Sequence, residues 1–221
     1  GAAFLRDAGA RALPPCVDAR RWPRLRRRAA VAVVLRPSEG GIEVLLMRRV
    51  ARARDRWSSQ ISCPGGFLRE GEDPIDGALR ETGEEVGLEL GRGDVLGLLE
   101  AHPERPWHRV ADFSVQPVVV WAPSPDAALT LAPSEVVSAR WISLTRLTGP
   151  GHRHRFWWWW RPAPRWPLAV PFHLARVHDG DYDVWGLTLR VLDRLGERLG
   201  GVARPGGAER SLGARRPGAK R

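Results

Sequence analysis

Three glutamates that lie close together in the chain are the residues best suited to chemistry. Glu84 and Glu85 follow Glu81 by three and four positions, so on a helix all three carboxylates share one edge. Like charges at these spacings repel and destabilise the helix that carries them. A divalent cation would offset this repulsion, because Mg²⁺ and Mn²⁺ bind carboxylates together with water and substrate phosphates. Judged alone, the three residues fit a solvated acidic helix face equally well.

The neighbouring residues predict the helix that would carry these glutamates. Asp73 is suited to the N-cap, Pro74 to the first helical position and Gly87 to the C-terminal cap. Gly83 inside the helix is unfavourable by about 1 kcal/mol relative to alanine. We therefore expect a helix over residues 73–86. Its apolar face would comprise four residues at helical spacing: Ile75, Leu79, Thr82 and Val86.

A longer pattern encloses the glutamates. It runs through Gly66, five residues, Glu72, seven residues, Arg80-Glu81, two residues, Glu84-Glu85, one residue, Gly87 and Leu88. An accidental match to seven such fixed identities has odds on the order of one in a million at average residue frequencies. Residues 66–88 resemble the Nudix box, the signature of hydrolases that split the pyrophosphate bond of a nucleoside diphosphate linked to another moiety. Thr82 stands at a position that is more often aliphatic in that family.

This resemblance implies a fold class and a metal site. The fold would be α/β (α+β), a Nudix-type α/β/α sandwich with a mixed central sheet. Glu81 and Glu85 would bind Mg²⁺ or Mn²⁺ directly, and the Gly66 carbonyl could complete the shell. Glu84 would be a further ligand or the base that activates water. The metal would lower the pKa of that water and neutralise charge on the phosphoryl oxygens.

The resemblance also assigns roles around this metal site. Glu72 and Arg80 would pair and shape the loop, and Gly87 would end the helix. Glu135 precedes a late strand in the manner of the family's catalytic base, and an ordinary loop glutamate is the alternative. Two weaker candidates for the base are Glu100 and Glu104.

Segments on both sides of the box resemble the coenzyme A diphosphatase branch of the family. These segments are residues 45–49, 55–66 and 184–192, and the whole resemblance covers residues 29–195. It implies a small-molecule nucleotide substrate, namely coenzyme A or a derivative. Arg48, Arg49 and Arg54 would bind its phosphates, or could equally be solvated.

Departures from that branch leave other substrates open. Ser59 stands where a glycine is usual, and Cys63 stands where an aromatic or aliphatic residue is usual. The spacing from Arg49 to Pro-Gly-Gly also differs by about one residue. The alternative substrates are ADP-ribose, a dinucleotide or a damaged nucleotide. A catalytically silent Nudix-fold module that binds a ligand or RNA is an alternative of another class, but silent relatives usually lose box glutamates and this chain keeps every one.

The rest of the chain predicts one domain between two flanks. β-Branched and apolar runs predict strands over residues 29–35, 42–48, 95–99, 113–121 and 138–142, the first two forming a hairpin. Helical spacing predicts a last helix within 182–199, with an apolar face of Val184, Leu187, Val191 and Leu195. We expect an N-terminal arm over residues 1–27, a Nudix hydrolase domain over 28–199 and a basic disordered tail over 200–221.

The net charge of +10 lies in the flanks. Residues 20–28 contribute +6 and residues 201–221 contribute +5, which leaves the rest of the chain at −1. Arginine accounts for 34 of the 35 basic residues, which indicates a compositional bias rather than a site. Because no recognised nucleic-acid-binding motif accompanies the charge, a nucleic-acid partner is not expected.

Composition also bears on location and assembly. The two cysteines, Cys16 and Cys63, favour a reducing compartment, so we expect a cytoplasmic protein without a disulfide framework, and a single bridge between them is the alternative. No apolar stretch approaches 18 residues, so no membrane span is expected. None of the six histidines has metal-ligand spacing, and His152 and His154 are expected to be solvated in a loop. The run Trp157–Trp160 could stack on a base, cover an acyl-pantetheine arm, form a homodimer contact or serve as an outer packing layer.

Overall fold

The computed structural model describes residues 27–53, 57–104, 113–122, 124, 126–160 and 170–199. The predicted basic tail and all of the predicted arm except its last residue, Arg27, lie outside the described residues, as do Arg54 and Cys16. None of the helices in the described ranges has the length and apolar composition needed to span a bilayer.

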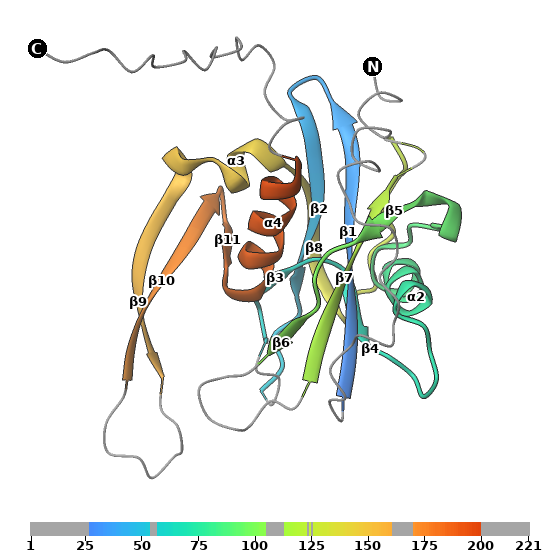
Figure 1. The fold of residues 1–221 in the computed structure, drawn as a ribbon, viewed down its shortest axis with the longest axis horizontal. Coiled ribbons are helices and arrows are strands. Elements are labelled where there is room, and N and C mark those ends of the chain that lie inside the picture. The colour runs from blue at the N-terminus through green and yellow to red at the C-terminus, as the bar shows by residue number, and fades with distance from the viewer. Residues whose placement is uncertain are drawn as a thin grey trace, which may run out of the picture.

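A mixed sheet forms the centre of the described structure (Figure 1). Strands β1 (Arg27–Ser38) and β2 (Gly41–Arg49) form the predicted antiparallel hairpin. Strand β7 (Phe113–Trp121) runs parallel to β1 along its other edge. Antiparallel strands extend the sheet on both sides: β5 (Val95–Leu98) and β6 (His102–Glu104) pair with β7, and β8 (Val136–Ser143) pairs with β2. The mixed central sheet expected from the sequence is confirmed.

A short segment fills the space where β1 and β2 diverge. The two long strands pair with each other only between Leu35–Ser38 and Gly41–Val44. Beyond this point β3 (Ile61–Ser62) pairs with the end of β2, and β4 (Gly65–Phe67) pairs with the start of β1. The first glycine of the box, Gly66, is therefore part of the central sheet, opposite Ala30 of β1.

Helices cover both faces of the sheet, as Figure 1 shows for α2 (Pro74–Val86) on one side and α4 (Gly186–Leu199) on the other. The alternation of side chains along β1 and β2 produces the two cores. One core, shared with α4 and the short helix α3 (Leu144–Thr148), contains Val33, Leu35, Val44 and Leu46. The other core, shared with α2, contains Ala32, Val34, Leu45 and Met47. The α/β/α sandwich is confirmed.

The C-terminal part of the domain differs from the prediction. Residues 182–185 form a strand, β11 (Tyr182–Trp185), and α4 begins only at Gly186. Gly186 has a φ of 62°, a left-handed conformation that changes the direction of the backbone between the strand and the helix. Val184 is buried on this strand, so the assignment of Val184 to the helix is wrong. Its apolar neighbours Leu187, Val191 and Leu195 do lie on the helix.

Strand β11 belongs to a second, three-stranded sheet. It pairs with β10 (Val170–Asp179), which pairs with β9 (Arg153–Trp160). The tryptophan run thus lies in a strand, and His154, expected in a loop, lies at the start of the same strand with an exposed side chain. His152 lies in a 3₁₀ turn, η3 (Pro150–His152), and is exposed as predicted.

Candidate active site

Helix α2 has the ends that its sequence predicts. Asp73 lies at the N-cap, where its Oδ1 accepts the Ile75 N–H at 2.9 Å, and Pro74 is the first helical residue. Gly87 ends the helix with a φ of 71°, and a Cβ at this position would lie 2.7 Å from the Cβ of Thr130. The helix is thus fixed at both ends, which sets the positions of the glutamates between them.

Thr82, the residue that departs from the box pattern, is compatible with a fully buried position. Its hydroxyl donates to the Ala78 carbonyl at 2.7 Å, one helical turn earlier. A buried hydroxyl that has a hydrogen-bond acceptor avoids most of the cost of desolvation. Threonine therefore packs against the sheet here much as an aliphatic residue would.

Glu85 is the most buried of the three helix glutamates, with its side chain 2% exposed. Its Oε2 accepts the Gly65 N–H at 2.8 Å, and Arg49 Nη1 lies 3.7 Å from its Oε1. Burial raises the pKa of Glu85 to about 8, and the nearby charge of Glu81 adds to the increase, while the Gly65 and Arg49 contacts oppose it. A positive charge next to this carboxylate would stabilise its ionised form.

Glu81 packs against the backbone of the neighbouring strand. A Cβ at Gly66 would lie 2.7 Å from the carboxylate carbon of Glu81, so any other residue at position 66 would displace this side chain. Glu81 and Glu85 therefore approach two consecutive glycines of β4, one carboxylate beside each. This arrangement requires both the helix and the strand that fills the gap between β1 and β2.

Glu72 and Arg80 form a bidentate ion pair. Arg80 Nε lies 2.7 Å from Glu72 Oε1, and its Nη2 lies 2.9 Å from Oε2. The Arg69 N–H also donates to Glu72 at 2.8 Å. The hydrogen bonds from Arg80 are the largest cause that lowers the pKa of Glu72, to about 2, and this pair likewise raises the pKa of Arg80. The loop before the helix is thereby tied to the helix itself.

Arg80 also contacts two of the three helix glutamates. Its Nη1 donates to Glu81 at 2.7 Å and to Glu84 at 2.9 Å. Arg69, which the sequence analysis did not single out, contributes a further contact to Glu84, at 3.2 Å. Glu84 is half exposed. The repulsion expected between the three carboxylates is therefore reduced by two arginines that lie on the loop and the helix.

The donor atoms around Gly66 suit a hard divalent cation. Within the described ranges, no three or more His, Cys, Asp or Glu side chains converge on a common point. Glu81 and Glu85 nevertheless place two carboxylates next to consecutive residues of β4. Mg²⁺ is commonly bound by one or two carboxylates, with water and substrate phosphates as the other ligands. The residues thus fit a divalent ion bound mainly by this pair.

The candidate bases outside the box have different surroundings relative to the glutamate cluster, which consists of Glu81, Glu84 and Glu85. The Glu135 side chain is 44% exposed, with Oε1 3.8 Å from Arg52, and its charge contributes to the raised pKa of Glu85. Its loop is joined to α2 by a hydrogen bond from the Ala132 N–H to the Glu85 carbonyl. Glu100 instead pairs with Arg198 near the far end of α4, and Glu104 lies in β6. Glu135 is therefore the candidate that the structure places beside the cluster.

The two described arginines of the predicted phosphate-binding set have different surroundings. Arg48 Nη2 donates to Asp181 at 2.8 Å, and its guanidinium lies over the ring of Tyr182, 5.4 Å from the centroid. Arg49 lies beside Glu85 and lines a cavity. Arg48 and Arg49 are consecutive residues of β2, so their side chains point to opposite faces of the sheet, Arg48 towards Tyr182 and Arg49 towards helix α2. The structure brings Arg49, and not Arg48, to the glutamates.

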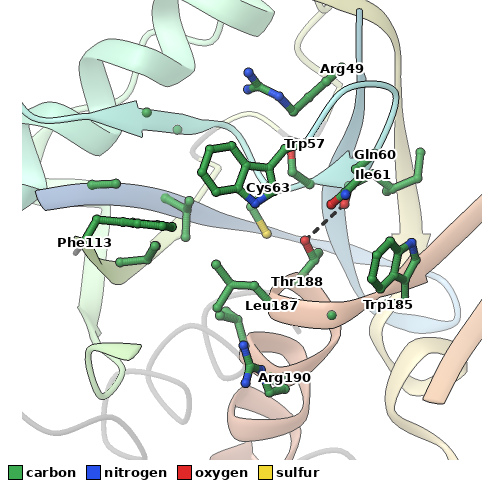
Figure 2. A pocket seen from close by; sticks show the side chains of 18 of the residues that line it. Arg49, Trp57, Gln60, Ile61, Cys63, Phe113, Trp185, Leu187, Thr188 and Arg190 are labelled. Carbon is green, nitrogen blue, oxygen red and sulfur yellow. Dashed lines mark hydrogen bonds between the residues drawn. The ribbon is translucent and has the colours of Figure 1, made fainter. Parts of the chain in front are cut away.

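A cavity of about 310 Å³ adjoins the glutamate cluster on the side of Gly65, Gly66 and Arg49. Figure 2 shows Trp57, Cys63 and Leu187 between Arg49 and Arg190. Trp57 and Phe113 form an edge-to-face pair with centroids 5.4 Å apart. The thiol of Cys63 is buried, which raises its pKa to about 12, so it forms part of the wall and is no nucleophile. Sequence reasoning missed this cavity.

Ser59 lies in the turn between Trp57 and Gln60, two residues that line the cavity. It has a φ of 60°, a left-handed conformation that glycine adopts most easily. The turn at this residue is closed by a hydrogen bond from the Gln60 N–H to the Trp57 carbonyl at 3.1 Å. The glycine that is usual at this position in the coenzyme A diphosphatase branch thus has a conformational reason, and serine retains the turn here.

Comparison with known proteins identifies the family of the chain. The NUDIX domain model matches residues 26–166, and the chain belongs to the Nudix hydrolase family. It is 33% identical over 179 residues to the human "Mitochondrial coenzyme A diphosphatase NUDT8", covering 77% of this chain and 70% of that protein. It is 31% identical over 187 residues to the "Uncharacterized Nudix hydrolase NudL" of Cronobacter sakazakii, covering 79% and 83% respectively.

A solved structure supports the fold independently. A MutT/nudix family protein from Enterococcus faecalis superposes with a TM-score of 0.54, covering 91% of this chain and 75% of that chain, at 14% identity. The family membership and the complete box identify the chain as a pyrophosphatase enzyme of the Nudix class. Nudix hydrolases generally use divalent metal ions.

Proposed function

We propose that this enzyme hydrolyses the pyrophosphate bond of coenzyme A or one of its derivatives. The observation that carries the proposal is the continuity of the glutamate cluster with the cavity, through Arg49 and the two glycines of β4. A diphosphate at the cluster would leave its nucleoside or its pantetheine arm to enter the cavity. The similarity to a coenzyme A diphosphatase over most of both chains supports the same substrate.

In this proposal Glu81 and Glu85 hold Mg²⁺ or Mn²⁺, with the Gly66 carbonyl as a further donor. When bound, the metal lowers the pKa of a water molecule and neutralises charge on the phosphoryl oxygens. Glu84 or Glu135 accepts the proton from the attacking water, because both carboxylates are partly exposed beside the cluster. Arg49 orients the diphosphate.

The reaction consumes one water molecule and breaks one P–O bond of the anhydride. Coenzyme A would yield adenosine 3′,5′-bisphosphate and 4′-phosphopantetheine. The test incubates the purified full chain and Mg²⁺ or Mn²⁺ with coenzyme A, ADP-ribose or a dinucleotide and identifies the phosphate products. Turnover of coenzyme A above the other two supports the proposal. Intact coenzyme A alongside turnover of another compound assigns a different substrate, and no turnover of any compound with either metal favours a ligand-binding module.

A further inference from the structure

The cavity beside the glutamate cluster has cationic groups on opposite sides and no acidic group among the described residues that line it. Arg49 is at the side of the glutamates, and Arg190 reaches the cavity from α4, with aromatic and aliphatic side chains between them (Figure 2). A ligand with one anionic group would use only one of these arginines. Two arginines on opposite sides of an apolar cavity suit a ligand that carries negative charge at two places, with a flat, apolar portion between them.

Arg190 faces the cavity because of its position on α4. Leu187, Arg190 and Val191 all line the cavity, and they are spaced as i, i+3 and i+4, which places them on one face of the helix. Gly186 and Thr188 of the first turn line it as well, and the Thr188 hydroxyl donates to the Ile61 carbonyl of β3 at 3.1 Å. This bond fixes the start of α4 against β3, whose residues Ile61 and Ser62 also line the cavity.

The walls between the two arginines suit a nucleobase. Trp57, Phe67 and Phe113 line the cavity, and Phe113 packs edge-to-face against each of the other two rings, with centroids 5.4 and 5.8 Å away. An aromatic face in a partly enclosed pocket stacks with any base. A volume of about 310 Å³ lies at the lower end of the range for small-molecule sites.

We propose that this cavity binds a nucleoside that carries a second phosphate, remote from the scissile diphosphate, and that Arg190 contacts this second phosphate. The inference rests on the proposed function, in that it places the nucleoside side of the diphosphate, and not the other moiety, in the cavity. A guanidinium recognises a phosphate monoester through paired N–H donors, so Arg190 is a specificity-determining residue for nucleoside 3′,5′-bisphosphate groups.

The test measures binding rather than turnover. Adenosine 3′,5′-bisphosphate and adenosine 5′-monophosphate contain no anhydride, so neither is hydrolysed, and calorimetric titration of the full chain compares their affinities. The bisphosphate is expected to bind about tenfold or more tightly, the typical effect of a charged hydrogen bond. Arg190→Ala should remove this preference while the affinity for the monophosphate is retained, and Arg190→Lys should keep part of it.

Two further variants separate a specific contact from a general effect. Arg194→Ala removes a cation one helical turn further along α4, where Arg194 pairs with Glu197 at 3.0 Å, and should leave the preference intact. Trp57→Ala should weaken both nucleotides by a similar factor, because it removes the stacking surface that they share.

Three outcomes overturn the inference: equal affinities for the two nucleotides in the native chain, an equal loss in Arg190→Ala and Arg194→Ala, or no binding of either nucleotide at millimolar concentration. Failure of the proposed function is a separate result. If the chain prefers the bisphosphate through Arg190 but leaves coenzyme A intact, the inferred nucleoside site is correct and the proposed substrate is wrong. A chain that cleaves coenzyme A with no such preference binds the nucleoside elsewhere.

Discussion

The glutamate cluster and the adjoining cavity are built in different ways. The cluster comes from one contiguous segment, residues 65–87, in which the helix, its caps and the Glu72–Arg80 pair lie close together in the sequence. The cavity takes its walls from β1, β7, the segment 57–67 and α4, which are up to about 160 positions apart in the chain. A local segment can therefore preserve the reaction while distant elements change the ligand.

The largest expected effect comes from the cluster. Glu85→Gln should reduce turnover on the order of 10³-fold, because it removes one negative charge of the proposed metal site and retains the acceptor for the Gly65 N–H. The thermal midpoint should change little, since the raised pKa of Glu85 shows that burial disfavours its charged form. Steady-state kinetics and thermal unfolding provide the two measurements.

Glu70→Gln is the matched control for this prediction. Glu70 lies in the same loop–helix segment, is exposed and is not part of the cluster, so its replacement should leave turnover within about twofold. Full activity in Glu85→Gln would show that the buried glutamate binds no catalytic metal, and the assignment would pass to Glu81 and Glu84.

The second prediction concerns the ion pair that ties the loop to the helix. Glu72→Gln should lower the free energy of unfolding by about 2 kcal/mol, because it leaves a largely buried arginine with a weaker partner. The pKa of Glu72 is lowered to about 2 from an ordinary value of 4.5. Its contribution is thus fully present above pH 4.5 and is lost as the pH falls towards 2. Denaturant unfolding between pH 6 and 2.5 should show the native chain approaching the variant.

Glu43→Gln is the matched control for the ion pair. Glu43 pairs with Arg36 at 2.8 Å in the β1–β2 hairpin, at a similar degree of burial and away from the cluster. Both variants should lose stability, but Glu72→Gln alone should also lose turnover, because Arg80 would shift towards Glu81 and Glu84. Equal turnover in the two variants would contradict a positioning role for Glu72.

The same contrast explains what could be predicted from the sequence. The α2 helix was predictable because its caps and apolar spacing are local, and the hairpin because its runs of β-branched residues flank a glycine turn. Residues 182–185 were assigned to a helix because Val184 fits helical spacing with Leu187, whereas the strand depends on pairing with the distant β10. The cavity was not predictable because its walls meet only in the fold, and the different roles of Arg48 and Arg49 depend on which distant elements cover each face of β2.

The smallest expected effect tests the turn that supports the cavity. Ser59→Gly should raise the free energy of unfolding by up to about 1 kcal/mol, because glycine adopts a φ of 60° without the steric cost borne by serine, although the freer unfolded chain offsets part of this gain. Ser59→Ala keeps the Cβ and removes the hydroxyl, so it should give no gain. Chemical denaturation of both variants checks this difference, and stabilisation by alanine as large as that by glycine would show that the hydroxyl, not the backbone conformation, sets the cost. The backbone hydrogen bond between Gln60 and Trp57 is retained in either variant, so the KM should stay near that of the native chain. An unchanged KM would show that the cavity wall tolerates either residue as long as the turn is preserved.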